Sequence, residues 1–446
     1  MTSKDPSRMF HRSLTASYRT AEGGQGCLIR DRQGKTYLDA SGGAAVSCLG
    51  HGHPRINAAI KRQVERLAFA HTSFFTNEPA EELAAHLSAN APGGPWRVFF
   101  TSGGSEATEA ALKLTRQMQV ERGETERDRY FSRLFSYHGN TLGALSVSGN
   151  AARRKLYGPI LGSNVTHVAP CFAYRHQRPD ESEAEYGLRA ARSLDEAAGA
   201  AGSRGIAFLA ETIVGATLGA APAAAGYFRE IRRICDRHGL FLILDEVMCG
   251  IGRSGTLHAF EQEGIVPDIV TLAKGLGAGY QPIGAVMVRE AIADELRRGS
   301  AAFQHGHTYM AHAIAAAAAL EVQKVIAEDG LVAGVARSGA LMRQMLDHAF
   351  GANPQVGDIR GRGLLFGIEL VADPETRAPF PPERGIAALI KSLALDRGLL
   401  CYPMSGTVDG VSGDHILLAP PYIISESEIE QAVEILRDVV EEVTGR

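Results

Sequence analysis

The stretches LFLILDEVMCGIGRSG (residues 240–255) and IVTLAKGLGAGYQPIG (residues 269–284) each open with an unbroken apolar run. Unbroken runs of this length are typical of parallel strands that are buried on both faces of a sheet. Asp245 directly follows the first run, and Lys274 directly follows the second. In open parallel α/β sheets, ligands lie beyond the carboxyl ends of the strands. The two stretches therefore predict an α/β protein with a carboxylate and a lysine at its ligand-binding edge.

The same strand-then-helix pattern recurs along residues 96–290. Three further apolar runs of strand type are WRVFF (96–100), FSRLFS (131–136) and IAFLA (206–210). Between them, EATEAALKLTRQM (106–118) and YFREIRRICDRHG (227–239) have the spacing of amphipathic helices, and Gly239 is a typical residue to end the second one. This alternation predicts a mostly parallel sheet with helices on both faces.

The pattern changes after about residue 330. GLLFGIELV (363–371) and HILLAPPYI (415–423) read as strands with looser spacing, and Ser425 with Glu428 forms a capping box before the last helix. At the other end of the chain, GCLIRDRQGKTYLDAS (26–41) predicts a hairpin, and Pro54 opens a helix with Ile56, Ile60, Val64 and Leu67 on one face. We expect a large domain over residues 65–330. A smaller α+β domain is expected from residues 1–64 together with 331–446.

Composition excludes several classes of partner. The chain has 446 residues and a formal net charge of −4, which gives no reason to expect nucleic acid or an anionic membrane as a partner. No stretch has the roughly 18 apolar residues of a membrane span. The six cysteines are scattered and the first residues, MTSKDPSRMFHRS, lack the apolar core of a secretory signal, so a cytoplasmic location is expected.

Polar or glycine-rich segments follow five of the predicted strands, including Tyr137-His138 and Glu211, and three of them have both a structural and a functional interpretation. Gly103-Gly104-Ser105 before a helix is either a tight turn or an anion site built from free amides at the helix N-terminus. Asp245 is either a helix N-cap or the partner of a buried cation, such as a protonated pyridine nitrogen. Lys274 is either a solvated surface charge or, wrapped by glycines after a buried strand, a lysine with a lowered pKa that can form a Schiff base.

Two other motifs are interpreted as structural. Gly250-Ile251-Gly252-Arg253-Ser254-Gly255 matches a dinucleotide-binding pattern, but DEVMC separates it from the strand and no helix opens there. His305-Gly306-His307 has no carboxylate or cysteine at ligand spacing, so no metal is expected.

Together these segments resemble the class III aminotransferases, the family of ornithine, 4-aminobutyrate and ω-amino acid:pyruvate aminotransferases. The resemblance covers about Gly26 to the C-terminus. The motifs that carry it include FFTSGGSEATEAALKLTRQ (99–117), YHGNTLGALS (137–146), LILDEVMCGIGRSG (242–255) and TLAKGLGAGYQPIGAV (271–286). It implies pyridoxal 5′-phosphate (PLP) as the cofactor and the fold-type I architecture of aspartate aminotransferase.

The resemblance also implies roles for particular residues. Lys274 is similar to the Schiff-base lysine, Asp245 to the partner of the pyridine nitrogen, and Gly104 with Ser105 to the phosphate-binding turn. Tyr137 and Val247 match the residues on the two faces of the cofactor ring. His138 and Glu211 match further residues of the cofactor site, and Thr308 a phosphate ligand donated by the neighbouring subunit. A homodimer with shared active sites is therefore expected, and it could pair further into a dimer of dimers.

The expected activity is transfer of an amino group from an amine or amino acid to a 2-oxo acid, with pyruvate as the first acceptor to consider. An aminomutase or a decarboxylating enzyme of the same fold is the alternative, and a non-catalytic module is a third. By analogy with the family, the pocket is expected to be shaped by Ser41–Ser47, Phe74, Phe75, Tyr157 and the 401–413 loop.

Two departures from the family pattern bear on the substrate. Met248 stands where several members have a glutamine that binds the phenolic oxygen of the cofactor. The 401–413 loop, CYPMSGTVDGVSG, has no arginine, whereas members with dual specificity often keep one there for a substrate carboxylate. Arg360 and Arg362 lie near in sequence, but a structural role is expected for both.

Overall fold

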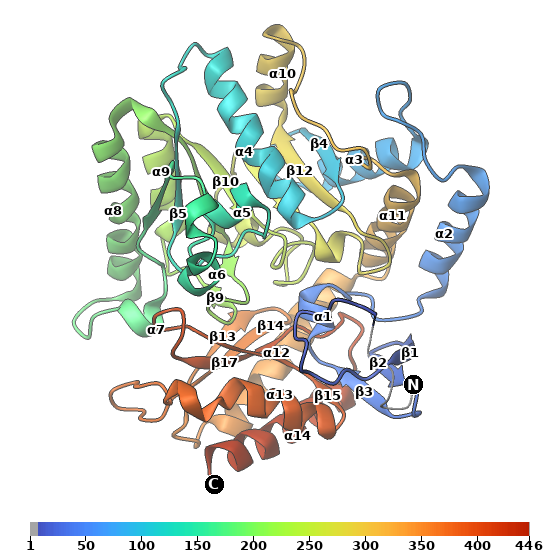
Figure 1. Ribbon diagram of the computed structural model, residues 1–446, viewed down its shortest axis with the longest axis vertical. Coiled ribbons are helices and arrows are strands. Elements are labelled where there is room, and N and C mark those ends of the chain that lie inside the picture. The colour runs from blue at the N-terminus through green and yellow to red at the C-terminus, as the bar shows by residue number, and fades with distance from the viewer. Residues whose placement is uncertain (1–7, 446) are drawn as a thin grey trace.

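A seven-stranded sheet forms the centre of the larger part of the chain in the computed structural model, with strand order β4-β12-β11-β10-β7-β5-β6 (Figure 1). All adjacent strands are parallel except at β12, which runs antiparallel to both β11 and β4. The predicted mostly parallel sheet is confirmed. Its strands are β4 (Trp96–Thr101), β5 (Arg129–Arg133), β6 (Val165–Val168), β7 (Gly205–Glu211), β10 (Phe241–Asp245), β11 (Ile269–Leu272) and β12 (Gly284–Arg289).

Helices cover both faces of this sheet, which explains the unbroken apolar strands. In β10, Leu242 and Leu244 belong to the apolar cluster that includes α9, whereas Phe241 and Ile243 belong to the cluster that includes α4. A strand with both faces buried has no polar side to alternate with. The helices around the sheet are α3 (Glu78–Asn90), α4 (Gly104–Glu121), α8 (Glu183–Ala201), α9 (Tyr227–His238), α10 (Glu290–Arg298) and α11 (Ala313–Glu328).

One predicted strand is placed differently. The run FSRLFS was expected as a strand over 131–136, but β5 spans Arg129–Arg133. Phe135 has a φ of 62°, in the left-handed region, which turns the chain out of the sheet immediately after the strand. The turn carries Tyr137 and His138 to the carboxyl edge.

The smaller part of the molecule is a four-stranded antiparallel sheet, β13-β14-β17-β16, packed against two helices, on which the last helix lies. The capping box predicted at Ser425 and Glu428 is present at the start of the last helix. These elements are β13 (Val356–Arg362), β14 (Leu365–Leu370), β16 (Tyr402–Ser405), β17 (Asp414–Leu418), α12 (Leu331–Phe350), α13 (Ile386–Asp396) and α14 (Glu426–Thr444).

The N-terminal segment completes a second four-stranded sheet with the C-terminal part. The predicted hairpin is present as β2 (Leu28–Asp31) and β3 (Thr36–Asp39), and β1 (Ala21–Gln25) pairs with β2. β15 (Leu399–Leu400) joins the edge of β3 in parallel. This pairing ties the two ends of the chain together, while the domain limits at residues 64 and 330 stay a prediction.

Helix α2 (Pro54–Arg66) buries only the first half of the predicted face. Ile56 is buried and Ile60 packs against the core as expected, but Val64 is 52% exposed and Leu67 is 41% exposed. Ala59 and Gln63 are buried instead. The helix packs on α11, and the Gln63 amide is satisfied by the carbonyl of Leu67 at 2.8 Å. Gln63 is therefore buried where the apolar spacing predicted Val64 to be buried.

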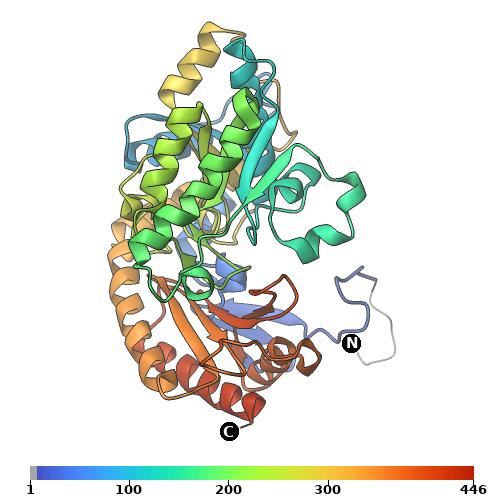
Figure 2. The same cartoon turned by 90° about the vertical axis from the view of Figure 1, so that its left-hand side faces the viewer.

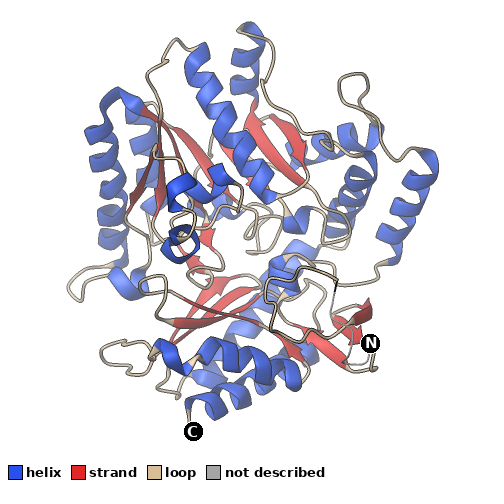
Figure 3. Ribbon diagram, viewed as in Figure 1, coloured by secondary structure: helices blue, strands red, loops and turns tan. Residues whose placement is uncertain are grey.

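In the side view, the smaller part lies beneath the larger one, and the short helices α5 and α6 project opposite to α8 and α9 (Figure 2). Where the larger and the smaller part meet, most of the chain is loop (Figure 3). The remaining short elements are α1 (Gly42–Ala45), α5 (Leu142–Val147), α6 (Ala151–Lys155), α7 (Ala173–His176), β8 (Ile213–Val214), β9 (Ala221–Pro222), and single 3₁₀ turns at Gly158–Ile160, Gly202–Arg204, Ala259–Glu263, Lys274–Leu276 and Pro382–Arg384.

The structure describes residues 8–445. The first seven residues of MTSKDPSRMFHRS, the stretch predicted to lack a secretory signal, lie outside this range. Within that range, no helix is long and apolar enough to cross a membrane. The alanine-rich segment at 311–322 forms most of α11, whose residues are largely buried.

Candidate active site

A cavity of about 550 Å³ opens at the carboxyl edge of the central sheet. This volume is within the range of small-molecule sites. The residues after β4, β5, β7, β10 and β11 all reach it, as parallel strand ends should. Of the residues predicted to form the cofactor site, it is lined by Gly104, Ser105, Tyr137, His138, Glu211, Asp245, Val247 and Lys274.

Asp245 is held as a buried carboxylate at the end of β10. The residue is 4% exposed. One oxygen accepts a hydrogen bond from the Val247 N–H at 3.0 Å, and the other lies 2.8 Å from Nδ1 of His138. No helix begins at residues 246–249, so the N-cap interpretation of Asp245 is wrong. A buried anion with two donors can still interact with a cation in the cavity.

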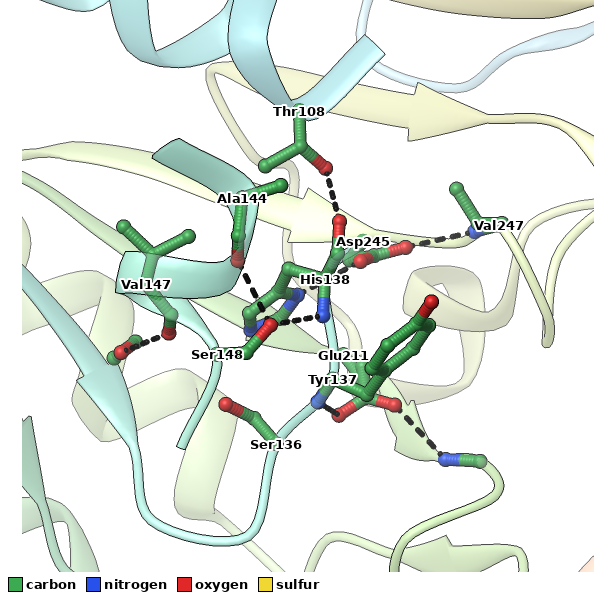
Figure 4. A network of polar contacts seen from close by, with 12 residues as sticks. Thr108, Ser136, Tyr137, His138, Ala144, Val147, Ser148, Glu211, Asp245 and Val247 are labelled. Atoms are coloured by element: carbon green, nitrogen blue, oxygen red, sulfur yellow. Dashed lines mark hydrogen bonds and ion pairs between the residues drawn. The ribbon is translucent and has the colours of Figure 1, made fainter. Parts of the chain in front are cut away.

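The backbone of His138 is held by hydrogen bonds at both its N–H and its carbonyl group (Figure 4). Its N–H donates to Ser148 Oγ at 2.8 Å, and its carbonyl accepts from Thr108 Oγ1 at 2.8 Å. These bonds join α4 and the end of α5 to the turn after β5. Because the backbone is held, the imidazole is presented to Asp245 in one orientation, which makes His138 a positioning residue for that carboxylate.

Glu211 ends β7, beside Asp245 in the register of the sheet. Its two oxygens accept backbone N–H groups, from Tyr137 at 3.2 Å and from Gly215 at 3.1 Å. Burial raises the pKa of Glu211, and the neighbouring charge of Asp245 raises it further, against the lowering effects of His138 and Arg133. Glu211 thus anchors the Tyr137 turn while its side chain borders the cavity.

Lys274 lies in a strained turn directly after β11. Its φ is 46°, a left-handed conformation that non-glycine residues adopt rarely and that clusters at functional sites. Burial lowers its pKa to about 8, although the carboxylates of Asp245 and Glu211 oppose the shift. Among the described residues, Nζ has no hydrogen-bond or ion-pair partner. The surface-charge interpretation is therefore wrong, and the amine is available as a nucleophile near neutral pH.

The N-terminus of α4 forms an anion cradle. Within residues 8–445, the amides of Gly104 and Ser105 have no acceptor, and such amides bind phosphate groups. Ser105 Oγ accepts the Asn140 N–H at 3.1 Å, which joins the cradle to the turn after β5. At Gly139, with a φ of 133°, a Cβ would lie 2.6 Å from Ser105 Oγ, so only glycine allows this approach.

The donor set fits a phosphorylated pyridine aldehyde. A free lysine amine can bind the aldehyde, a buried carboxylate can pair with the ring nitrogen, and the cradle can hold the phosphate. Tyr137 and Val247 line the cavity between these groups. The residues present therefore suit PLP.

Several expected pocket residues lie elsewhere. Thr308 is exposed and does not line this cavity. Phe74 and Phe75 are 80% and 66% exposed, and Tyr157 is also exposed. The other expected pocket segments do contribute, through Gly43, Ala44, Val46 and Tyr402.

Two arginines in the cavity wall were missed by the sequence analysis. Arg12 comes from the N-terminal segment, and Arg153 comes from α6. Arg153 lies over the ring of Tyr137, with its guanidinium carbon 4.6 Å from the ring centroid. In sequence it is one member of the basic run Arg153-Arg154-Lys155, which has no feature that separates it from a solvated surface.

The structure also places the residues that were interpreted as structural. Arg360 pairs with the fully buried Glu369 at 2.6 Å, and Arg362 pairs with Glu263 at 2.7 Å, both away from the cavity. Arg253, in the glycine-rich segment 250–255, donates a hydrogen bond to the Leu364 carbonyl at 3.0 Å. This bond connects the larger part of the molecule to the smaller one. Among residues 8–445, no group of three His, Cys, Asp or Glu side chains could hold a metal.

The fold and this site define a PLP-dependent enzyme of fold type I. A sequence profile of the class-III aminotransferases matches residues 10–440, and the chain belongs to that family. It is 41% identical over 444 residues to an uncharacterized aminotransferase of Schizosaccharomyces pombe, covering 98% of this chain and 97% of the relative.

Solved structures agree with that assignment. A thermostable (S)-enantioselective omega-transaminase from Thermomicrobium roseum superposes with a TM-score of 0.89 at 34% identity, over 96% of this chain and 93% of that one. The PMP-bound form of an aminotransferase from Vibrio fluvialis gives a TM-score of 0.90 at 28% identity, with the same coverage. The protein is a class III aminotransferase, and PLP is its cofactor.

Proposed function

We propose that this enzyme transfers an amino group from an amine or an ω- or α-amino acid to a 2-oxo acid, with pyruvate as acceptor, by a ping-pong mechanism. The observation that carries the proposal is the placement of Lys274 and Asp245 at neighbouring strand ends of one cavity. Bound PLP supplies an electron sink that stabilises negative charge at the carbon bearing the amino group.

Lys274 and Asp245 have complementary roles in this proposal. The Lys274 amine holds the cofactor and, once released, carries a proton between the substrate carbon and the cofactor, for which a pKa near 8 suits it. The Asp245 carboxylate keeps the ring nitrogen protonated, and His138 orients that carboxylate. Both groups come from rigid strand ends, so their relative position is set before substrate arrives.

The remaining residues position the cofactor. Gly104 and Ser105 would hold the phosphate at the start of α4, and Tyr137 and Val247 would pack against the ring. Glu211 holds the Tyr137 backbone and borders the substrate side. Met248 also lines the cavity, and its thioether cannot donate a hydrogen bond to the cofactor as a glutamine would.

The test uses enzyme purified with PLP. A donor panel of β-alanine, taurine, a diamine and an aromatic amine is added without acceptor, and the visible absorbance of the lysine-bound cofactor is followed. We expect at least one donor to remove the band and pyruvate to restore it with formation of alanine. Release of carbon dioxide, or product formed from one substrate alone, would instead identify the decarboxylating enzyme or the aminomutase.

We also propose a homodimer with shared active sites, in which Thr308 contacts the phosphate bound by the other subunit. The support is that Thr308 and its neighbour Tyr309 are exposed, and that Tyr309 is 62% exposed beside Phe69, with ring centroids 5.7 Å apart. Together with the exposed Phe74 and Phe75, these rings form an aromatic surface of the kind found at protein interfaces.

The expected cytoplasmic location stays a proposal. Its support is that all six cysteines are free thiols, which is usual in a reducing compartment.

A further inference from the structure

Arg153 and Arg12 give one wall of the cavity an unpaired positive charge. Arg153 is half-buried on α6, and its guanidinium carbon lies 4.6 Å from the centroid of the Tyr137 ring. Within the described part of the chain, no carboxylate forms an ion pair with either arginine. A guanidinium that is partly removed from water binds anions well, and it presents a planar fork of donors that matches a carboxylate.

The anionic groups of the cavity itself are already engaged. Asp245 is bonded to His138 and to the Val247 amide, and Glu211 is bonded to the Tyr137 and Gly215 amides. The cofactor phosphate has its own cradle at the start of α4. The Arg153 guanidinium is therefore available to bind an anionic group of the substrate.

The 401–413 loop packs against α6. A Cβ at Gly410 would lie 3.6 Å from the Cβ of Ala151, so the loop and the helix are in contact. The loop itself contributes Tyr402 to the cavity but carries no arginine or lysine. The cation on this side of the cavity thus comes from the helix on which the loop packs.

We propose that Arg153 binds the carboxylate of the substrate, with Arg12 as a second cation at the cavity mouth, and that the enzyme consequently prefers amino acids and 2-oxo acids over uncharged amines and aldehydes. The inference rests on the proposed transamination at the same site. It assigns to Arg153 the selection of substrates by charge.

The first test measures binding without reaction. Propionate, which has a carboxylate and no amino group, is titrated by calorimetry into the PLP-loaded parent enzyme and into Arg153→Gln, Arg153→Lys and Lys155→Gln. Lys155 is the matched control because it is an exposed cation of the same helix that does not line the cavity. We expect Arg153→Gln to weaken binding about 10- to 100-fold, the range for loss of a charge-assisted hydrogen bond. Arg153→Lys should recover part of it, and Lys155→Gln should match the parent.

The second test compares β-alanine with 1-aminopropane as donors in the half-reaction. Arg153→Gln should raise the half-saturating concentration of β-alanine by a similar factor and leave the response to 1-aminopropane within about twofold. Equal loss with both donors, or unchanged propionate binding, would overturn the proposal. Weaker retention of PLP by Arg153→Gln would instead assign the arginine to the phosphate.

The two tests separate this inference from the proposed function. If no donor of the panel changes the absorbance of the parent enzyme, the proposed donor range is wrong, while propionate binding still reports on Arg153. If donors react and propionate binds equally to the parent and to Arg153→Gln, only the assignment of Arg153 is wrong.

Discussion

Asp245 is a buried carboxyl group at the end of β10, and that placement suits a partner with a positive charge. The change Asp245→Asn keeps the shape and the hydrogen bond from Val247 but removes the charge. We expect kcat to fall about 100-fold or more, the scale on which a preorganised charge stabilises a transition state. The measurement is steady-state kinetics with a reactive donor and pyruvate. Asp438→Asn, at an exposed ion pair of α14, is the control, and equal kinetics for both variants would contradict the role of Asp245.

Lys274 predicts a pH dependence for capture of the cofactor. Burial lowers the pKa of its amine from 10.5 to about 8, so the neutral, nucleophilic form is reached at lower pH than for an ordinary lysine. The rate at which cofactor-free enzyme binds PLP covalently should rise up to about pH 8 and then level off. Stopped-flow absorbance measures this rate. Lys274→Ala should show no covalent capture and the exposed Lys391→Ala should match the parent, whereas a rate still rising above pH 10 would contradict the shift.

At the scale of single elements, the last helix depends on its N-terminal cap. In α14, Ser425 Oγ accepts the Glu428 N–H, and the Glu428 side chain accepts the Ser425 N–H at 2.8 Å. Ser425→Ala removes one half of this box and should lower the free energy of unfolding by about 1 kcal/mol. Urea unfolding followed by circular dichroism measures it. Ser427→Ala, in the same exposed turn, should change stability by less than half as much, and an equal loss in both variants would assign the effect to helix composition.

At the scale of the whole molecule, the shared-site proposal predicts complementation between two inactive chains. Lys274→Ala removes the nucleophile, and Thr308→Glu places a negative charge where the phosphate of the other subunit is proposed to lie. If Thr308 acts across the interface, each mixed dimer has one site free of both changes. Coexpression should then restore about a quarter of the parent activity, since about half of random dimers are mixed. No recovery from verified mixed dimers would place Thr308 with its own chain.

Some features of the fold could be predicted from neighbouring residues, and others could not. The capping box, the apolar strands and the closing Gly239 follow from neighbouring residues, and all are present. The end of β5 and the second half of the buried face of α2 were predicted wrongly, because the first depends on a left-handed turn at Phe135 and the second on packing against α11. Such features depend on tertiary context, which sequence periodicity does not contain.

By itself, the sequence determined the candidate chemistry. Asp245 and Lys274 after two buried strands, and a glycine turn before a helix, each left a structural alternative open, and their combination resembled the class III aminotransferases. Only the tertiary structure decided which other charges reach that chemistry. Arg12 and Arg153 lie far from Lys274 along the chain, in segments that resemble solvated surface, and they line the cavity because the N-terminal segment and α6 fold over it. The physical reason is that cofactor groups are supplied by rigid strand ends, whose positions follow from strand order, whereas the substrate wall is built from loops and short helices placed by long-range packing.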